Sequence, residues 1–84
     1  MVYLKQGSSG ELVRRLQTAL NFVVRPSPPL AVDGIFGPRT ANVVSAFQRQ
    51  AGVVVDGVVG PQTSAALVGS MLRARPNAAQ NTKP

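Results

Sequence analysis

A nine-residue segment occurs twice in this chain and constrains its fold more than any other feature. Residues 32–40 read VDGIFGPRT and residues 55–63 read VDGVVGPQT, with six of the nine positions identical at an offset of 23 residues. In each copy Asp-Gly favours a tight turn, the later Gly can cap a helix, and Pro suits the first helical position. Each copy therefore predicts a turn that leads directly into a helix.

The polar residues of both copies have a structural explanation. Asp33 and Asp56 each precede a Gly, so we expect them to form Asx turns and not a pair of catalytic carboxylates or a calcium site. A threonine at the third helical position, as Thr40 and Thr63 are, can satisfy nearby turn backbone. The predicted turn residues are Asp33, Gly34, Gly37, Pro38, Asp56, Gly57, Gly60, Pro61 and Thr63.

Apolar periodicity predicts three helices, over residues 9–23, 38–51 and 61–71. Ser8 and Glu11 have the spacing of a capping box for the first helix, whose apolar stripe begins at Leu12 and leaves Gln17 on the solvent face. The predicted fold class is all-α, a compact three-helix bundle with two repeated turn-helix units. Residues 31–32 and 53–55 are extended enough to pair as two very short strands.

The residue types available limit the chemistry of this chain. It contains no Cys and no His and only three acidic residues among 84. Disulfides, thiolate zinc sites and triad catalysis are excluded. Three acidic residues also offer few carboxylates for a mechanism that needs two of them. We therefore expect no catalytic residues, no metal, no cofactor and no enzyme activity of the domain itself.

The positive charge is concentrated near the end of the chain. Of nine cations, three (Arg73, Arg75 and Lys83) lie in the last twelve residues, so residues 1–72 carry six cations against three carboxylates, a net charge of +3. Residues 73–84 show no apolar periodicity and are predicted to be a disordered tail or linker that could join a catalytic domain or a protein partner. Residues 1–72 are the predicted domain, expected to be monomeric.

No apolar run is long enough to span a membrane, and residues 1–10 lack the pattern of a secretory signal. A protein of this kind working outside the cytoplasm would therefore need another segment or route for export.

Three ordered motifs resemble one family. The first helix has the form G-x-x-G-x-x-V-x-x-L-Q-x-x-L, and it is followed by D-G-x-F-G-x-x-T and then by A-F-Q before the second D-G turn. This order is similar to the peptidoglycan-binding domain-like family (type 1), over residues 4 to about 68. The residues that carry the first motif are Gly7, Gly10, Val13, Leu16, Gln17 and Leu20.

The resemblance implies a non-catalytic module that binds bacterial cell-wall peptidoglycan, through its glycan strand or stem peptide, and holds a murein-active enzyme against the wall. Such a module works in the cell envelope (periplasm or cell wall), or is secreted or injected, as in an endolysin. Two departures stand out: Ser64 replaces the aromatic residue common in the family, and the link over residues 25–31 is longer than usual.

Several side chains are candidates for contact with such a ligand. Arginine and glutamine offer donors to the carboxylates and amides of murein, while an aromatic edge can contact a sugar. A core role competes with ligand contact for Phe36, and a turn role competes for Thr40. The candidate ligand-binding residues are Tyr3, Phe36, Arg39, Thr40, Gln48, Arg49 and Gln62.

Two other classes of function remain open. A small basic three-helix chain is also typical of helix-turn-helix nucleic-acid-binding proteins, but residues 52–60 exceed the short turn of that motif, and residues 61–71 contain no Lys or Arg. We therefore expect no nucleic-acid partner. A protein-interaction or assembly module that reuses the fold is the main alternative, and the missing aromatic at Ser64 favours it.

Overall fold

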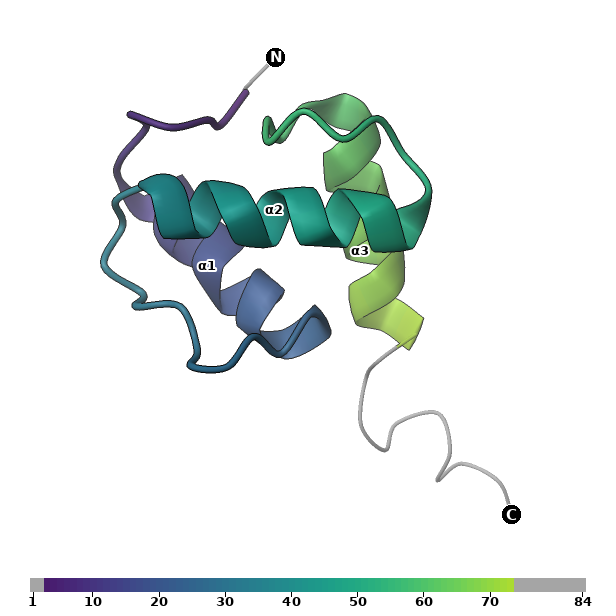
Figure 1. Ribbon diagram of the computed structural model, residues 1–84, viewed down its shortest axis with the longest axis horizontal. Helices are drawn as coiled ribbons and strands as arrows, with labels where there is room; N and C mark the ends of the chain where they lie inside the picture. Colours follow the sequence, from purple (N-terminus) through teal and green to yellow (C-terminus); the bar gives the residue numbers. More distant parts are fainter. Residues whose placement is uncertain (1–2, 74–84) are drawn as a thin grey trace.

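The computed structural model describes residues 3–73, which form three α-helices (Figure 1). These are α1 (Glu11–Val23), α2 (Pro38–Ala51) and α3 (Pro61–Arg73), and α1 packs against both of the others. The all-α prediction is confirmed. Helix α3 continues to Arg73, two residues past its predicted end, because no residue between 71 and 73 interrupts a helix. The tail predicted over residues 73–84 was wrong at Arg73, which is the last residue of α3. Residues 74–84 of that prediction lie outside the described residues.

The repeated turns set where α2 and α3 begin. Gly37 is extended (φ −103°) before Pro38, the first residue of α2, and Pro61 opens α3 in the same way. Helix α2 ends at Ala51 and is capped by Gly52, which has a left-handed backbone (φ 75°) and donates its N–H to the carbonyls of Gln48 and Arg49. Turn and cap chemistry in the sequence therefore fixes both ends of α2.

The start of α1 differs from the predicted capping box. The residue before α1 is Gly10, and no side chain caps the helix. Ser8 Oγ accepts the N–H of Lys5 at 3.1 Å instead, while the N–H of Gly10 donates to the carbonyl of Gly34 at 2.9 Å. The capping box is absent because the residues before α1 pair with the first repeat.

The two predicted short strands also do not form. The segment before α1 pairs with both repeated turns, through isolated antiparallel bridges of Leu4 with Val59 and of Ser9 with Ile35. The N–H groups of Leu4 and Val59 donate to each other's carbonyls at 3.0 and 2.8 Å. Figure 1 shows this segment beside the loop that leads into α3. The contacts come from Gly34 and from residues after each Asp-Gly, and not from the residues predicted to form strands before it. Residues 4–10 therefore tie the two repeats together.

A single apolar core lies between the helices, and the buried face of α1 is rotated from the predicted stripe. Leu12 is 51% exposed, whereas Gln17 is only 1% exposed, because the first repeat folds over its side of the helix. The link before the first repeat contributes Leu30 to the core. The buried apolar residues are Val13, Leu16, Ala19, Leu20, Leu30, Phe36, Val43, Val44, Phe47, Val59 and Leu67.

Candidate ligand-binding site

The aspartates of the two repeats hold their turns through the same hydrogen bonds. Asp33 Oδ1 accepts the N–H of Ile35 at 3.0 Å, and Asp56 Oδ1 accepts the N–H of Val58 at 3.0 Å. The N–H of Ile35, followed by the amide of Gln17, lowers the pKa of Asp33 below its ordinary value. The pKa of Asp56 is lowered in the same way. Both carboxylates are thus ionised, and each accepts a backbone hydrogen bond within its own turn.

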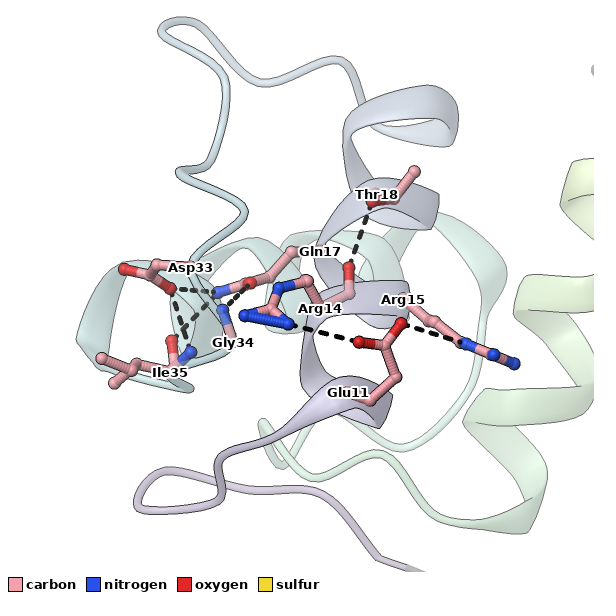
Figure 2. Close-up of polar contacts among 8 residues, drawn as sticks. All are labelled: Glu11, Arg14, Arg15, Gln17, Thr18, Asp33, Gly34 and Ile35. Carbon is pink, nitrogen blue, oxygen red and sulfur yellow. Dashed lines mark hydrogen bonds and ion pairs between the residues drawn. The ribbon is translucent and has the colours of Figure 1, made fainter.

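Two buried glutamines complete these turns. Gln17 of α1 reaches into the first repeat, as Figure 2 shows. Its Nε2 donates to Asp33 Oδ1 (3.1 Å), to the carbonyl of Ile35 (3.0 Å) and to Thr40 Oγ1 (3.2 Å). Its Oε1 accepts the N–H of Gly34 at 2.9 Å. The surface ion pairs of Glu11 in the same view are exposed and contribute little to stability.

Gln48 of α2 makes the corresponding contacts with the second repeat. Its Nε2 donates to Asp56 Oδ1 (2.9 Å), to the carbonyl of Val58 (3.0 Å) and to Thr63 Oγ1 (3.0 Å). Its Oε1 accepts the N–H groups of Asp56 and Gly57 at 3.0 and 2.9 Å. The structural repeat is therefore longer than nine residues and includes the glutamine of the preceding helix.

The two glutamines were not predicted to match, because their distances from the repeats differ. Gln17 lies 16 residues before Asp33, whereas Gln48 lies 8 residues before Asp56. Helix α1 runs on to Val23 after its glutamine, further than α2 runs after Gln48, and the link that follows α1 is also longer; together these differences hide the equivalence. An alignment of the two repeats that continued towards the N-terminus and allowed extra residues in the first copy would have matched Leu16-Gln17 with Phe47-Gln48.

Burial removes three of the predicted ligand-binding residues from contact with a large ligand. Phe36 is 1% exposed, Thr40 3% and Gln48 0%. Phe36 packs in the core. The polar groups of Thr40 and Gln48 are hydrogen-bonded within the turn structures. A ligand-binding role does not fit these positions, because a polymer cannot reach them.

Each repeat borders a hollow in the surface, and the two hollows occupy equivalent positions. We call them the first hollow (about 330 Å³) and the second hollow (about 230 Å³). Six matched positions line both, namely Asp33, Ile35, Gly37, Pro38, Arg39 and Thr40 in the first and Asp56, Val58, Gly60, Pro61, Gln62 and Thr63 in the second. The fold thus presents two related concave sites in which Arg39 and Gln62 are counterparts.

The long link holds Arg39 at the first hollow. Asn21 of α1 clamps Leu30 from both sides, since Leu30 N–H donates to Asn21 Oδ1 (2.8 Å) and Asn21 Nδ2 donates to the carbonyl of Leu30 (3.0 Å). The carbonyl of Pro28 in this anchored link accepts a hydrogen bond from Nη2 of Arg39. An arginine has five N–H donors, so the remaining ones can serve a ligand.

Tyr3 gives the second hollow a different wall. An ideal Cβ placed on Gly60 would lie 2.6 Å from Cε2 of Tyr3, whereas one on Gly37 would meet nothing within 4 Å. The ring of Tyr3 therefore lies directly on Gly60, and it remains 56% exposed. Gln62 is exposed beside it. The structure brings Tyr3 and Gln62 together at one hollow and Arg39 at the other.

Arg49 is placed apart from these candidates. It is exposed near the C-terminal end of α2 and is not among the residues that line either hollow. Ten residues of helix separate it from Arg39, a distance of about 15 Å along the axis.

A third concave region is an apolar groove between α1 and α3. We call it the α1–α3 groove; its volume is about 330 Å³, and Leu12, Leu67 and Met71 are among its lining residues. Ser64, where the family commonly has an aromatic residue, also lines it. The small side chain leaves this groove open.

Among residues 3–73 no three His, Cys, Asp or Glu side chains gather as metal ligands would. Within the same residues, every helix is too short or too polar to cross a membrane.

The fold and its paired hollows define a small all-α module built from two turn-helix units. A family model described as a putative peptidoglycan binding domain matches residues 9–67, and the chain belongs to this family.

The chain is similar to parts of two longer cell-wall enzymes. It is 45% identical over 50 residues to a zinc D-Ala-D-Ala carboxypeptidase of Streptomyces albus G, covering 60% of this chain and 20% of the relative. It is 35% identical over 66 residues to a probable N-acetylmuramoyl-L-alanine amidase of Bacillus licheniformis, covering 79% of this chain and 19% of the relative. The chain thus spans about a fifth of the length of these curated relatives.

A solved structure with the same fold is the N-terminal domain of SleB, at a TM-score of 0.74 and 35% identity. The match covers 82% of this chain and 92% of that one.

Proposed function

We propose that this domain binds peptidoglycan without catalysing its turnover and thereby holds a murein-active enzyme at the wall. Family membership is the observation that carries the proposal, and the two hollows supply a matching surface. Murein offers sugars, amides and free carboxylates, and these hollows present an arginine, a glutamine amide and an aromatic ring. The proposed site consists of Arg39, Gln62 and Tyr3.

The relatives support the proposed context. Matching segments occupy a small part of a carboxypeptidase, an amidase and a phage endolysin from Burkholderia. A flexible polymer must be ordered on binding, so the affinity of one domain should be modest. Many equivalent sites on the wall still raise the local concentration of an attached enzyme. The proposed location is the cell envelope or the outside of the cell.

Retention on purified murein sacculi tests the proposal, and the chain offers a matched pair of variants. Arg39→Gln and Arg49→Gln each remove one positive charge from α2, so they weaken non-specific attraction to an anionic polymer equally. Loss of one charge-assisted contact should reduce retention of Arg39→Gln by about fivefold, whereas Arg49→Gln should behave as the unmodified domain.

Two controls make this experiment decisive. Far-UV circular dichroism melts would show that both variants fold. An unrelated basic protein of equal charge measures background adsorption. Retention of the unmodified domain at that background level would refute wall binding.

Protein docking is a second candidate function, and the α1–α3 groove is the observation that favours it. Leu12, Val68 and Leu72 are 51%, 55% and 60% exposed on the two helices that form the groove. A protein-binding role predicts that Leu12→Lys abolishes association with a murein-active enzyme domain added separately, while retention on sacculi is unchanged. Unchanged association would exclude this candidate.

A further inference from the structure

We infer that the two hollows are non-equivalent subsites, the first for a carboxylate of the stem peptide and the second for an uncharged sugar of the glycan strand. This assignment rests on the proposed function and adds which part of murein each hollow binds. It follows from the three differences between two otherwise matched sites: their charge, their aromatic content and the rigidity of the polar side chain.

Charge is the first difference. Asp33 and Asp56 occupy the same position in the two hollows, and hydrogen bonds lower the pKa of each, so both are anionic at neutral pH. The charge of Arg14 acts on Asp33, and Arg39 lines the same first hollow. In the second hollow Gln62 stands in place of Arg39, and no Lys or Arg is among its lining residues. A ligand carboxylate would therefore meet a guanidinium at the first hollow and only a like charge at the second.

Pre-organisation is the second difference. Arg39 is tethered to the carbonyl of Pro28, and that part of the link is anchored through Leu30, which is 4% exposed and clamped by Asn21. A tethered guanidinium loses less rotamer freedom when it binds a carboxylate, and its planar donors match a carboxylate in a bidentate manner. The second repeat has no counterpart of this link, because Gly52 and Val53 follow α2 directly.

The aromatic wall is the third difference. Tyr3 lies on Gly60 with 56% of its surface exposed, and Val54 of the same hollow is 66% exposed. An exposed ring on a fixed floor, with an aliphatic side chain and an amide beside it, provides apolar contact for the face of a sugar and a donor for its acetamido group. The first hollow has no aromatic side chain among its lining residues.

The experiment is a titration of ¹⁵N-labelled domain with two probes, an N-acetylglucosamine tetrasaccharide and a stem tetrapeptide. The peptide should shift the amide signals of residues 35–37 and 39, and the tetrasaccharide should shift those of residues 60, 62 and 63. A peptide with its carboxylates amidated should bind the first hollow about tenfold more weakly, the effect of losing a bidentate charged pair.

Exchanging the matched residues gives the sharpest test. Arg39→Gln should weaken peptide binding about fivefold or more and leave the dissociation constant for the tetrasaccharide within about twofold. Gln62→Arg should create peptide-induced shifts at residues 60, 62 and 63. Tyr3→Leu should weaken only the tetrasaccharide. Arg49→Gln is the charge-matched control.

The outcomes separate this assignment from the proposed function. Overlapping shifts from the two probes, an unchanged peptide affinity in Arg39→Gln, or no binding of either probe would overturn the subsite assignment. Retention on sacculi would still support wall binding in each of those cases. Background-level retention of the unmodified domain would refute the proposed function itself.

Discussion

Replacement of Gln48 by alanine should destabilise this domain more than any single polar substitution on its surface. Gln48 is fully buried and joins α2 to both ends of the second turn through five hydrogen bonds. The alanine variant leaves the N–H groups of Asp56 and Gly57 and the hydroxyl of Thr63 without this partner. It also opens a void where the amide lay.

The expected loss follows from the number of buried groups involved. An unsatisfied buried polar group costs about 1–3 kcal/mol, and water can rehydrate the outer part of the turn, so we expect a total loss of about 2–4 kcal/mol. A domain of this size has a free energy of unfolding of about 4–11 kcal/mol. The melting temperature should therefore fall by at least about 8 °C.

Urea unfolding followed by far-UV circular dichroism measures this loss, with Gln50→Ala as the control. Gln50 is exposed on the same helix, and its loss should change the free energy of unfolding by less than about 0.5 kcal/mol. Thr63→Ala should cost less in the Gln48→Ala background than alone, because the two side chains share one hydrogen bond. If Gln48→Ala is no more destabilising than Gln50→Ala, the glutamine does not hold the turn.

Three further substitutions or conditions test other parts of the structure. The pKa of Asp33 and that of Asp56 are lowered in the folded state, so the free energy of unfolding should be constant near neutral pH and fall below about pH 4. Urea midpoints measured from pH 7 to pH 2 would show this fall. A midpoint that rises on acidification would contradict the role of these carboxylates in the turns. Gly60→Ala should displace Tyr3 and weaken tetrasaccharide binding severalfold, whereas the matched Gly37→Ala should leave it unchanged; equal effects in a titration would show that the ring does not rest on that glycine. Ser64→Tyr should cover the α1–α3 groove and raise the free energy of unfolding by about 1 kcal/mol, and a melt unchanged from that of the parent would show that the groove does not accept the ring.

Local chemistry explains which parts of the fold were predictable. The starts of α2 and α3 and the end of α2 follow from Gly and Pro at fixed positions, whose backbone preferences act over a few residues. The start of α1 was not predictable from its S-x-x-E pattern. Ser8 and Gly10 have hydrogen-bond partners in a turn about 25 residues away in the sequence, and those contacts displaced the local cap.

The candidate site was predicted only in part, for a related reason. Arg39, Gln62 and Tyr3 were candidates by residue type, and the structure places them at the two hollows. Gln48 was a candidate for the same reason, yet it is buried, and Gln17 was expected in solvent. Residue type tells which hydrogen bonds a glutamine side chain can make. The packing of a turn from another part of the chain decides whether those hydrogen bonds are made with the turn or are open to a ligand.

The sequence by itself determined the repeated turn-helix units, the number of helices and the family, because all three depend on short motifs in a fixed order. Only the tertiary structure showed that a glutamine from the preceding helix completes each turn. It also showed that residues 4–10 join the two repeats, and that the hollows differ in charge and aromatic content. These features depend on contacts between residues 8 to 57 positions apart, and such pairings are set by how the three helices pack around one core.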